Sequence, residues 1–377
     1  MIELTDRQRE VWELHKEGLN NCEIGRKLGV TEATVRGILK RAFAKAELSD
    51  SQPGFTVKGR TTLIKDGVTV LEWVKTHKEK EDKATQGLTE VIDQILKGLR
   101  DTVPRMPKTK RPKLSANQDD YMNSFVFGDE HLNMRAFREE CMGNDWDLKI
   151  AIERHREAML QLISNALPAR FARLISLGDL LHNDSMRPQT FAGTDVDVDG
   201  RMGLALDQAV LLLRYMIDLM LTIYQEIEVI LARGNHPPTM ELAISKMITI
   251  AYEKDPRVKV IKNEPKHIPL VWENNFQLIT HGDRLNPQKK ADIATSVYRA
   301  QHGAANFTHI LSGHLHHKDQ KSLSGCLTEV FEVLPTPDCW HTESGFVTSD
   351  QSASVLRYHK NGGIIDRHEY NPRFYME

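Results

Sequence analysis

The chain has 377 residues, a formal net charge of −2 and a pI of about 6.8, so a polyanionic partner could be held only by a local patch of basic residues. Its four cysteines have no paired metal-binding spacing, and the charged N-terminus has no apolar signal region, which predicts a cytoplasmic protein with reduced thiols. The longest apolar stretch, residues 209–224, is interrupted by Arg214 and Asp218 and predicts a buried helix, with no membrane segment.

The first 47 residues have the pattern of three short helices. Thr5 and Gln8 have the spacing of a capping box, and apolar residues follow at helical spacing. A second helix around Ile24 is expected to end in a turn at Gly29, and a third is expected from about Glu32 to Glu47. Three helices with a glycine in the second turn predict a helix-turn-helix.

Residues 3–47 resemble the helix-turn-helix of response regulators and sigma-factor C-terminal domains, through Leu-Thr-x-Arg-Gln and Glu-Ile-Gly-x-x-Leu-Gly-Val-Thr-x-Ala-Thr-Val. This resemblance implies a recognition helix whose basic residues contact DNA: Arg36, Lys40, Arg41 and Lys45. Residues 1–50 hold nine Lys and Arg and nine Asp and Glu, so the segment lacks a strong basic excess. A protein-docking bundle therefore remains an alternative to a DNA-binding module.

A connector is expected at residues 49–120, between the predicted domains 1–48 and 121–377. Residues 55–74 alternate around Asp66-Gly67, which predicts a β-hairpin, and residues 91–99 have the pattern of an amphipathic helix. Residues 100–113 contain six basic residues, one acidic residue and three prolines. They predict an extended basic linker, which either follows a nucleic-acid backbone or is a solvated spacer.

Five short polar clusters follow apolar runs in the second half of the chain. They are Asp129-Glu130-His131, Gly178-Asp179, Gly234-Asn235-His236, His281-Gly282 and Gly313-His314-Leu315-His316. The apolar runs predict buried strands, and several are separated by stretches of helical length, so the clusters should meet at the carboxyl ends of strands in an α/β fold. Carboxylate, amide and imidazole groups suit Mn²⁺, Fe, Ni or Zn²⁺, so the clusters predict a metal site.

The order of the clusters resembles the calcineurin-like metallophosphoesterase superfamily from residue 121 to about residue 370. The resemblance implies a two-sheet αββα sandwich and a two-metal phosphoesterase, with Mn²⁺ expected first and Fe, Ni, Zn²⁺ or Mg²⁺ as alternatives. It implies one metal on Asp129, His131, Asp179 and His316, and a second on Asp179, Asn235, His281 and His314.

His236 matches the family's histidine that faces the scissile phosphate and acts as general acid or transition-state stabiliser. The family places an acidic residue directly after this histidine, whereas this chain has Pro237-Pro238. Another group must therefore orient His236 if it is catalytic.

The residues after Asp179 resemble the Gly-Asp-Leu-Phe-His segment of the nuclease subunit of the double-strand-break repair complex, and similar segments of bacteriophage-encoded phosphoesterases. This likeness makes His182 a candidate catalytic residue, in contact with a metal ligand or with substrate; a structural histidine beside Asp184 is the alternative. The acidic stretch 195–199 is expected in a loop beside the site, where it disfavours a duplex polyanion.

The last part of the chain has a strand-rich pattern. Residues 327–334 alternate, and residues 354–358 and 364–368 flank Asn361-Gly362-Gly363 as a predicted hairpin. These strands are expected to complete the second sheet of the sandwich.

Together these patterns predict a dinuclear metal-dependent phosphodiesterase, a DNA nuclease or DNA-processing enzyme with an N-terminal DNA-binding module. One alternative is a phosphoesterase acting on a small nucleotide or cyclic nucleotide. Another is a DNA-binding regulator in which the phosphoesterase domain is an inactive scaffold stabilised by metal. DNA is the expected partner, and a protein partner or a homo-oligomer is left open.

Overall fold

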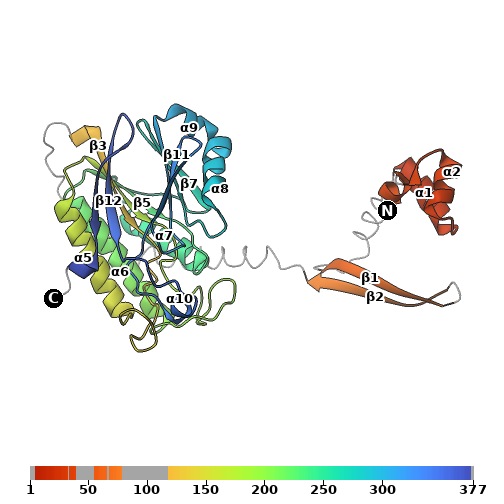
Figure 1. Ribbon diagram of the computed structural model, residues 1–377, viewed down its shortest axis with the longest axis horizontal. Helices are drawn as coiled ribbons and strands as arrows, with labels where there is room; N and C mark the ends of the chain where they lie inside the picture. The colour runs from red at the N-terminus through yellow and green to blue at the C-terminus, as the bar shows by residue number, and fades with distance from the viewer. Residues whose placement is uncertain (1–4, 33, 40–54, 66–67, 79–117, 375–377) are drawn as a thin grey trace. The chain divides into compact units, whose positions relative to one another are not determined.

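The computed structural model describes residues 5–32, 34–39, 55–65, 68–78 and 118–374. The chain divides into two compact units, Met1–Gln94 and Ile95–Glu377. Each unit is described by itself, and Figure 1 labels their elements.

The N-terminal unit contains the predicted helix-turn-helix. Its first two helices are α1 (Asp6–Lys16) and α2 (Asn21–Leu28), and residues 34–39 are also helical. Asn20 caps α2 through reciprocal bonds with Glu23: the Asn20 side chain accepts from the Glu23 amide at 3.0 Å, and the Glu23 carboxylate accepts from the Asn20 amide at 2.8 Å. Gly29 then turns the chain with a φ of +66°, a conformation that glycine adopts without steric cost.

One small apolar core joins the three helices. Its buried members come from all three helical segments: Val11, Leu14, Ile24, Val35, Ile38 and Leu39. The side chain of Arg36 is exposed and pairs with Glu32, one turn earlier. The remainder of the predicted third helix, with Lys40, Arg41 and Lys45, lies outside the described residues.

The same unit contains an antiparallel pair, β1 (Phe55–Lys65) and β2 (Val68–Lys78), as the alternating pattern predicts. The predicted turn at Asp66-Gly67, the predicted helix at 91–99 and the predicted linker at 100–113 lie outside the described residues.

The second unit is built on two sheets. The six-stranded sheet has the order β13-β12-β3-β4-β5-β6 and the five-stranded sheet has the order β10-β11-β9-β8-β7. The first sheet consists of β3 (Tyr121–Phe127), β4 (Phe171–Ser176), β5 (Glu226–Leu231), β6 (Val258–Val260), β12 (Ala353–His359) and β13 (Ile364–Tyr370). The second consists of β7 (His267–Trp272), β8 (Asn275–Thr280), β9 (Phe307–Ser312), β10 (Asp319–Leu323) and β11 (Cys326–Val330). Strands β3 to β6 are mutually parallel, as are β8, β9 and β11.

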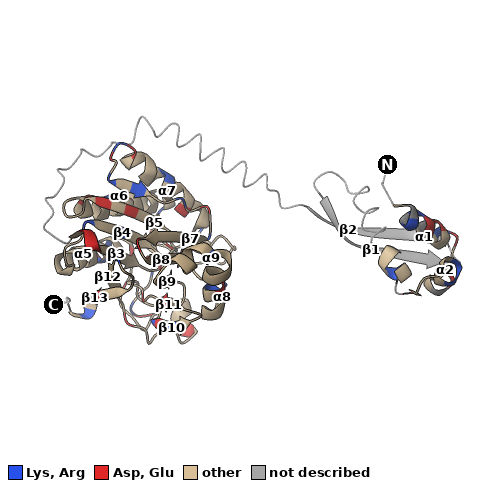
Figure 2. Ribbon diagram, turned by 90° about the horizontal axis from the view of Figure 1, so that it is seen from above, with Lys and Arg blue, Asp and Glu red and all other residues tan. Residues whose placement is uncertain are grey.

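Helices cover the outer face of each sheet. The six-stranded sheet is covered by α5 (Leu148–Asn165), α6 (Met202–Leu221) and α7 (Pro238–Tyr252). The five-stranded sheet is covered by α8 (Pro287–Asp292), the π-helical turn η2 (Ile293–Val297) and α9 (Arg299–Ala304). Figures 1 and 2 show α5 and α6 on one side of the strands and α8 and α9 on the other. The short elements are η1 (Gln118–Asp120), α10 (Cys339–Glu343) and η3 (Pro372–Phe374).

Successive residues of the central strands face different apolar cores, because side chains alternate along a strand. In β3, Phe125 packs under the helices α5 to α7, whereas Val126 packs between the two sheets. In β9, Leu311 packs between the sheets, whereas Ile310 packs under α8. Strands buried on both faces give the continuous apolar runs seen in the sequence. The predicted αββα sandwich is thus confirmed.

The C-terminal hairpin joins a different sheet from the one expected. Strands β12 and β13 extend the six-stranded sheet, with β12 antiparallel to β3, and only β10 and β11 complete the five-stranded sheet. Val355 faces the helix-covered core and Leu356 faces the core between the sheets. This alternation fits the edge of either sheet, so the sequence pattern alone does not determine which one the hairpin extends.

The apolar stretch at 209–224 mainly forms α6, as predicted, with its buried face against β5. Among the helices of the described residues, none combines the length and the apolar character needed to cross a bilayer.

Candidate metal centre

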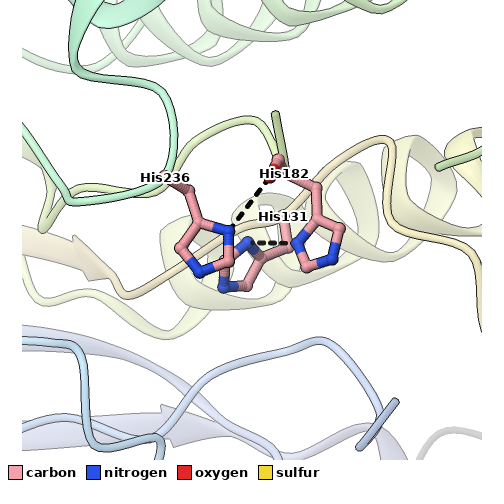
Figure 3. A group of neighbouring side chains, drawn as sticks. All are labelled: His131, His182 and His236. Atoms are coloured by element: carbon pink, nitrogen blue, oxygen red, sulfur yellow. Dashed lines mark hydrogen bonds between the residues drawn. The ribbon is translucent and has the colours of Figure 1, made fainter. Parts of the chain in front are cut away.

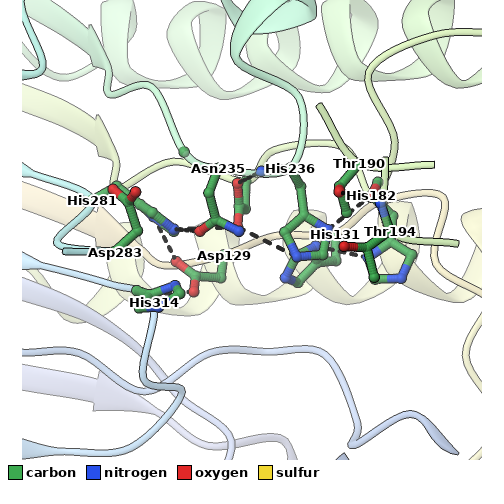
Figure 4. Close-up of polar contacts among 12 residues, drawn as sticks. Asp129, His131, His182, Thr190, Thr194, Asn235, His236, His281, Asp283 and His314 are labelled. Atoms are coloured by element: carbon green, nitrogen blue, oxygen red, sulfur yellow. Dashed lines mark hydrogen bonds and ion pairs between the residues drawn. The ribbon is translucent and has the colours of Figure 1, made fainter. Parts of the chain in front are cut away.

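Both sheets contribute to one cluster of polar side chains at the carboxyl ends of their strands. The loops after β3, β4 and β5 carry Asp129, Asp179 and Asn235, and those after β8 and β9 carry His281 and His314. Figure 4 shows Asp129, Asn235, His281 and His314 close to one another. The placement at strand ends agrees with the sequence prediction.

One group of ligand atoms comes from Asp129, His131 and His316, which place one donor atom each within 4.8 Å of the others. The Nε2 atom of His316 lies 2.9 Å from Oδ2 of Asp129. Asp129 and His131 are buried, so these donors are held away from bulk water.

A second group lies around Asp179. The Nε2 atom of His281 lies 2.8 Å from Oδ1 of Asn235 and 3.2 Å from Oδ2 of Asp179. The ring of His314 is 5.1 Å from that of His281, and its backbone amide donates to Asp129 at 2.7 Å. Asp129, Asp179 and His281 also form a close trio, so the two groups are contiguous. The structure thus brings all seven predicted ligands together.

The donor atoms of this centre fit divalent cations. Nδ1 of His281 donates to the carbonyl of Leu177 at 3.0 Å, so in the neutral ring Nε2 directs a lone pair at the oxygens of Asn235 and Asp179. Oδ1 of Asp129 is buried and has no hydrogen-bond partner among the described residues. Converging lone pairs and an unpartnered carboxylate oxygen are favourable only around a cation.

The pKa values of the buried groups also indicate that the site favours a positive charge. Burial by itself would lower the pKa of His281, but the carboxylates of Asp179 and Asp129 raise it to about 10. Burial would raise the pKa of Asp179, but His281 and His236 hold that pKa well below its ordinary value. The pocket therefore stabilises a cation beside two ionised carboxylates.

The backbone at the site is strained. Seven described residues other than glycine have a positive φ, and five of these are predicted ligands. They are Asp129 (φ 40°), His131 (φ 38°), Asp179 (φ 59°), His314 (φ 73°) and His316 (φ 53°). Side chains other than glycine adopt this region at a cost, and such strain concentrates at functional sites.

Two glycines make room for the carboxylates. A Cβ atom on Gly313 would lie 2.2 Å from Oδ1 of Asp129, and one on Gly234 would lie 1.8 Å from Oδ1 of Asp179. Any side chain at either position would displace a carboxylate, so the glycines of these two clusters are needed for space.

A backbone carbonyl orients His236. Its Nδ1 atom lies 3.0 Å from the carbonyl oxygen of His182, as Figure 3 shows, and its amide donates to Asp179 at 2.8 Å. Because a carbonyl only accepts, Nδ1 carries the hydrogen, and Nε2 lies on the side of Asp179, 4.0 Å from Oδ2. This contact supplies an orienting group that Pro237 cannot provide.

His182 is buried against a predicted ligand. Its Nδ1 atom lies 3.0 Å from Nδ1 of His131 (Figure 3). Its Nε2 atom lies 3.9 Å from Oδ2 of Asp338. One of the two facing nitrogens must donate to the other, so the contact links the tautomer of His182 to that of His131.

Glu241 was not predicted from the sequence, although its carboxylate links the loops after β4 and β5. Glu241 is fully buried in the first turn of α7 and accepts from the amide of Leu180 at 3.1 Å and from that of Gly234 at 2.7 Å. Burial, together with the nearby Asp179, raises the pKa of Glu241 well above its ordinary value. The available signal was an acidic residue one helical turn after Pro237, at the expected start of a helix.

Sequence reasoning also missed the segment at α10. Asp338 caps this helix and accepts from Nδ1 of His341 at 2.7 Å, and the His341 ring stacks on His316 with centroids 4.8 Å apart. Asp338 and His341 lie outside the five polar clusters of the sequence. They come close to His316 only when the chain is folded.

The centre opens into a cavity of about 640 Å³. One wall is the loop that contains Thr190 and residues 194–197, which confirms that the acidic stretch lies beside the site. Another part of the wall comes from Leu315 and from residues 338–341 and 346. Predicted ligands and His236 also line the cavity, so a molecule that enters the cavity meets them directly.

Comparisons with known proteins gave two kinds of match, a family model at the N-terminus and solved structures similar to a larger part of the chain. The family model of sigma-70 region 4 matches residues 1–45. A comparison with curated proteins gave no match.

Several solved structures are similar to about two thirds of the chain. An archaeal phosphodiesterase has a TM-score of 0.34 and 12% identity, and covers 66% of this chain and 99% of its own. The phosphoesterase YfcE from E. coli has a TM-score of 0.32 and 13% identity, with coverage of 66% and 98%. Vps29 from Entamoeba histolytica in complex with Zn²⁺ has a TM-score of 0.27 and 11% identity, with coverage of 66% and 99%.

Proposed function

We propose that residues 121–377 form a dinuclear metal-dependent phosphodiesterase and that the N-terminal helix-turn-helix binds DNA. The observation that carries the proposal is the convergence of seven predicted ligands in one cluster, five of which line the cavity, next to a histidine that a backbone carbonyl orients. Buried donors with unsatisfied lone pairs and strained backbones are maintained at a cost in stability, which function would explain.

Asp129, His131, Asp179 and His316 would hold one cation, and Asp179, Asn235, His281 and His314 the other. A pair of divalent cations supplies positive charge beside a phosphate and makes water more acidic. The donors are oxygen and imidazole nitrogen, so Mn²⁺ is the proposed metal, with Fe, Ni, Zn²⁺ or Mg²⁺ as alternatives.

His236 is the proposed general acid. Its Nδ1 atom is occupied by the His182 carbonyl, which leaves Nε2 to exchange a proton with substrate. Protonation of the leaving oxygen by a positioned side chain typically contributes about 10²–10⁴ in rate.

His182 is proposed as a positioning residue, because it is buried and touches His131. A partner on the second ring nitrogen of a metal-bound histidine fixes its tautomer, and loss of such a partner typically costs about 10–100-fold in metal affinity or activity.

Nucleic acid is the proposed substrate, because the same chain carries a helix-turn-helix that matches sigma-70 region 4. A small nucleotide phosphodiester is the second candidate. It is favoured by the carboxylates of Asp195, Asp197 and Asp338 in the cavity wall, which repel a long polyanion.

The enzymatic proposal is tested by supplying Mn²⁺ and measuring hydrolysis of single-stranded and duplex DNA, RNA, cyclic nucleotides and a generic aryl phosphodiester. We expect cleavage by the native chain and none by Asp179→Asn. Equal activity of the two proteins would trace the hydrolysis to a contaminant, and failure on every substrate would leave the inactive regulator as the better account.

DNA binding is tested by replacing Arg36 and Lys40 together with Ala. The plot of log affinity against log salt should become shallower by up to about 1.8, because each phosphate contact contributes about 0.9 to the slope on duplex DNA. Replacing Lys149 and Lys321 with Ala, which removes the same charge from exposed positions of the other unit, is the control. Undiminished binding after deletion of residues 1–48 would identify these helices as a protein-docking module.

A further inference from the structure

A row of aromatic rings leads from the metal centre into the wall of the cavity. The ring of His341 stacks on that of His316 at 4.8 Å, and the ring of Trp340 meets that of His341 edge-on at 5.0 Å. Phe346 continues the row, 5.8 Å from Trp340. The ring contacts therefore continue from His316, a predicted metal ligand, to the apolar rings of Trp340 and Phe346 in the cavity wall.

The outer members of this row are exposed although they are apolar. Trp340 is 61% exposed, Phe346 is 62% exposed, and the neighbouring Leu315 is 48% exposed. All three line the cavity, and we refer to the rings of Trp340 and Phe346 as the aromatic platform. A contiguous apolar surface that borders a polar site is characteristic of ligand binding.

The charges around the platform limit what can be bound. The described residues that line the cavity include Asp179, Asp195, Asp197 and Asp338, but no lysine or arginine. A duplex is held mainly through rows of phosphates paired with basic side chains, which this wall does not provide. An unpaired base needs only a π-face to stack against, and every base offers one.

We propose that the aromatic platform binds an unpaired nucleobase attached to the phosphodiester at the metal centre. The proposal rests on the proposed function, and it specifies the substrate: a nucleoside phosphodiester with an unpaired base, from a dinucleotide or from a single strand. The cavity of about 640 Å³ has room for a base as well as a phosphate.

The platform is held in place before a ligand arrives. Asp338 accepts from the amide of His341 at 2.9 Å and so caps the helix that carries Trp340. The thiol of Cys339 lies 3.5 Å from that of Cys141, so the start of the same helix contacts the loop before α5. A preorganised surface loses less entropy when it binds a base, which strengthens the interaction.

The test compares two chromogenic esters that share the p-nitrophenolate leaving group, thymidine 5′-(p-nitrophenyl phosphate) and methyl p-nitrophenyl phosphate. With Mn²⁺, the native chain should prefer the thymidine ester in kcat/KM by about 5- to 150-fold, the range that stacking of one base gives. Trp340→Ala combined with Phe346→Ala should abolish the preference, mainly through a higher KM for the thymidine ester. Phe374→Ala, which removes a ring that is 77% exposed outside the cavity, should change neither substrate.

No preference in the native chain, or a preference that survives the double substitution, would overturn the proposal. If neither ester is hydrolysed, the proposed function has failed, and binding then decides the matter separately. Thymidylyl-thymidine should quench tryptophan fluorescence saturably in the native chain and not in Trp340→Phe. Quenching that is absent, or equal in the two proteins, would also exclude the platform as a base-binding surface.

Oligonucleotides with non-hydrolysable linkages test whether the base can come from a single strand as well as from a dinucleotide. A single-stranded oligothymidylate should compete with thymidylyl-thymidine for the platform in the native chain, with saturable quenching of tryptophan fluorescence as the measurement. If the same oligonucleotide competes equally well as part of a duplex, the base is not required to be unpaired, and the proposal is wrong in that respect.

Discussion

The Nδ1 atom of His236 lies 3.0 Å from the carbonyl oxygen of His182. A peptide carbonyl only accepts hydrogen bonds, so in the neutral ring this contact places the hydrogen of His236 on Nδ1 and leaves Nε2 as the acceptor. The backbone of one loop therefore orients the imidazole of the next, without an acidic side chain.

Replacing His236 with Ala should leave the metal content unchanged and lower turnover on substrates with a poor leaving group by about 10²–10⁴. The loss should be much smaller for an aryl phosphodiester, whose leaving group needs no proton. Elemental analysis and turnover on both kinds of substrate check this. Loss of metal would make His236 a ligand, and equal losses on both substrates would rule out proton transfer as its role.

Replacing Asp179 with Asn should remove both metals together with activity, because a neutral amide cannot balance two adjacent dications. The measurement is the number of metal equivalents per chain in purified protein. Asp207→Asn, an exposed change on α6, is the matched control and should keep the native content. Two equivalents retained in Asp179→Asn would refute a shared role for this carboxylate.

Replacing Gly313 with Ala should weaken metal binding by at least about tenfold, since the added methyl would lie 2.2 Å from Oδ1 of Asp129 and displace that carboxylate. Gly303→Ala is the matched control, because no atom lies within 4 Å of its added methyl. The control should stabilise the protein by roughly 0.5–1 kcal/mol through the better helix propensity of alanine. Calorimetric titration of Mn²⁺ into both variants checks the contrast, which is contradicted if Gly313→Ala binds metal as the native chain does.

Glu329 should make part of the stability dependent on acid pH. Burial would raise its pKa, but hydrogen bonds from His309 and Arg367 lower it to about 2. The folded-state pKa lies below the ordinary value of 4.5, so this stabilisation is present above pH 4.5 and is lost as the pH falls towards 2.

Glu329→Gln should therefore lower the free energy of unfolding by about 3 kcal/mol near pH 7, because it leaves Arg367 without its buried partner. The difference from the native chain should shrink as the pH falls from 4.5 towards 2. Denaturant unfolding at several pH values measures it, with the exposed change Glu139→Gln as control. A difference that stays constant across this range would show that the charge of Glu329 does not stabilise the fold.

The set of predicted ligands could be recognised in the sequence because each member lies in the loop that follows a strand buried on both faces. Such strands give unbroken apolar runs, and the polar residues after them are conspicuous. Asp129 and His314 can therefore be recognised from the local pattern alone, although their distance from each other in space depends on the arrangement of both sheets.

Other features depend on tertiary contacts that leave no local pattern. Glu241 and Asp338 act across loops, and their roles depend on which amides and rings lie opposite them. The hairpin of β12 and β13 fits the edge of either sheet, so its position is decided by packing. The DNA contacts of Lys40, Arg41 and Lys45, and the domain boundaries at 48 and 120, stay predictions.

The predicted metal ligands come from loops on both sheets. An unfolded chain cannot assemble donors from the ends of β3, β4, β5, β8 and β9, so cations would bind the native state selectively. At a hundredfold excess over its dissociation constant, each bound ion would add about 2.7 kcal/mol to the free energy of unfolding. Occupancy would also couple the two sheets, because separating them would dismantle both sites, and the sandwich should then unfold as one cooperative unit.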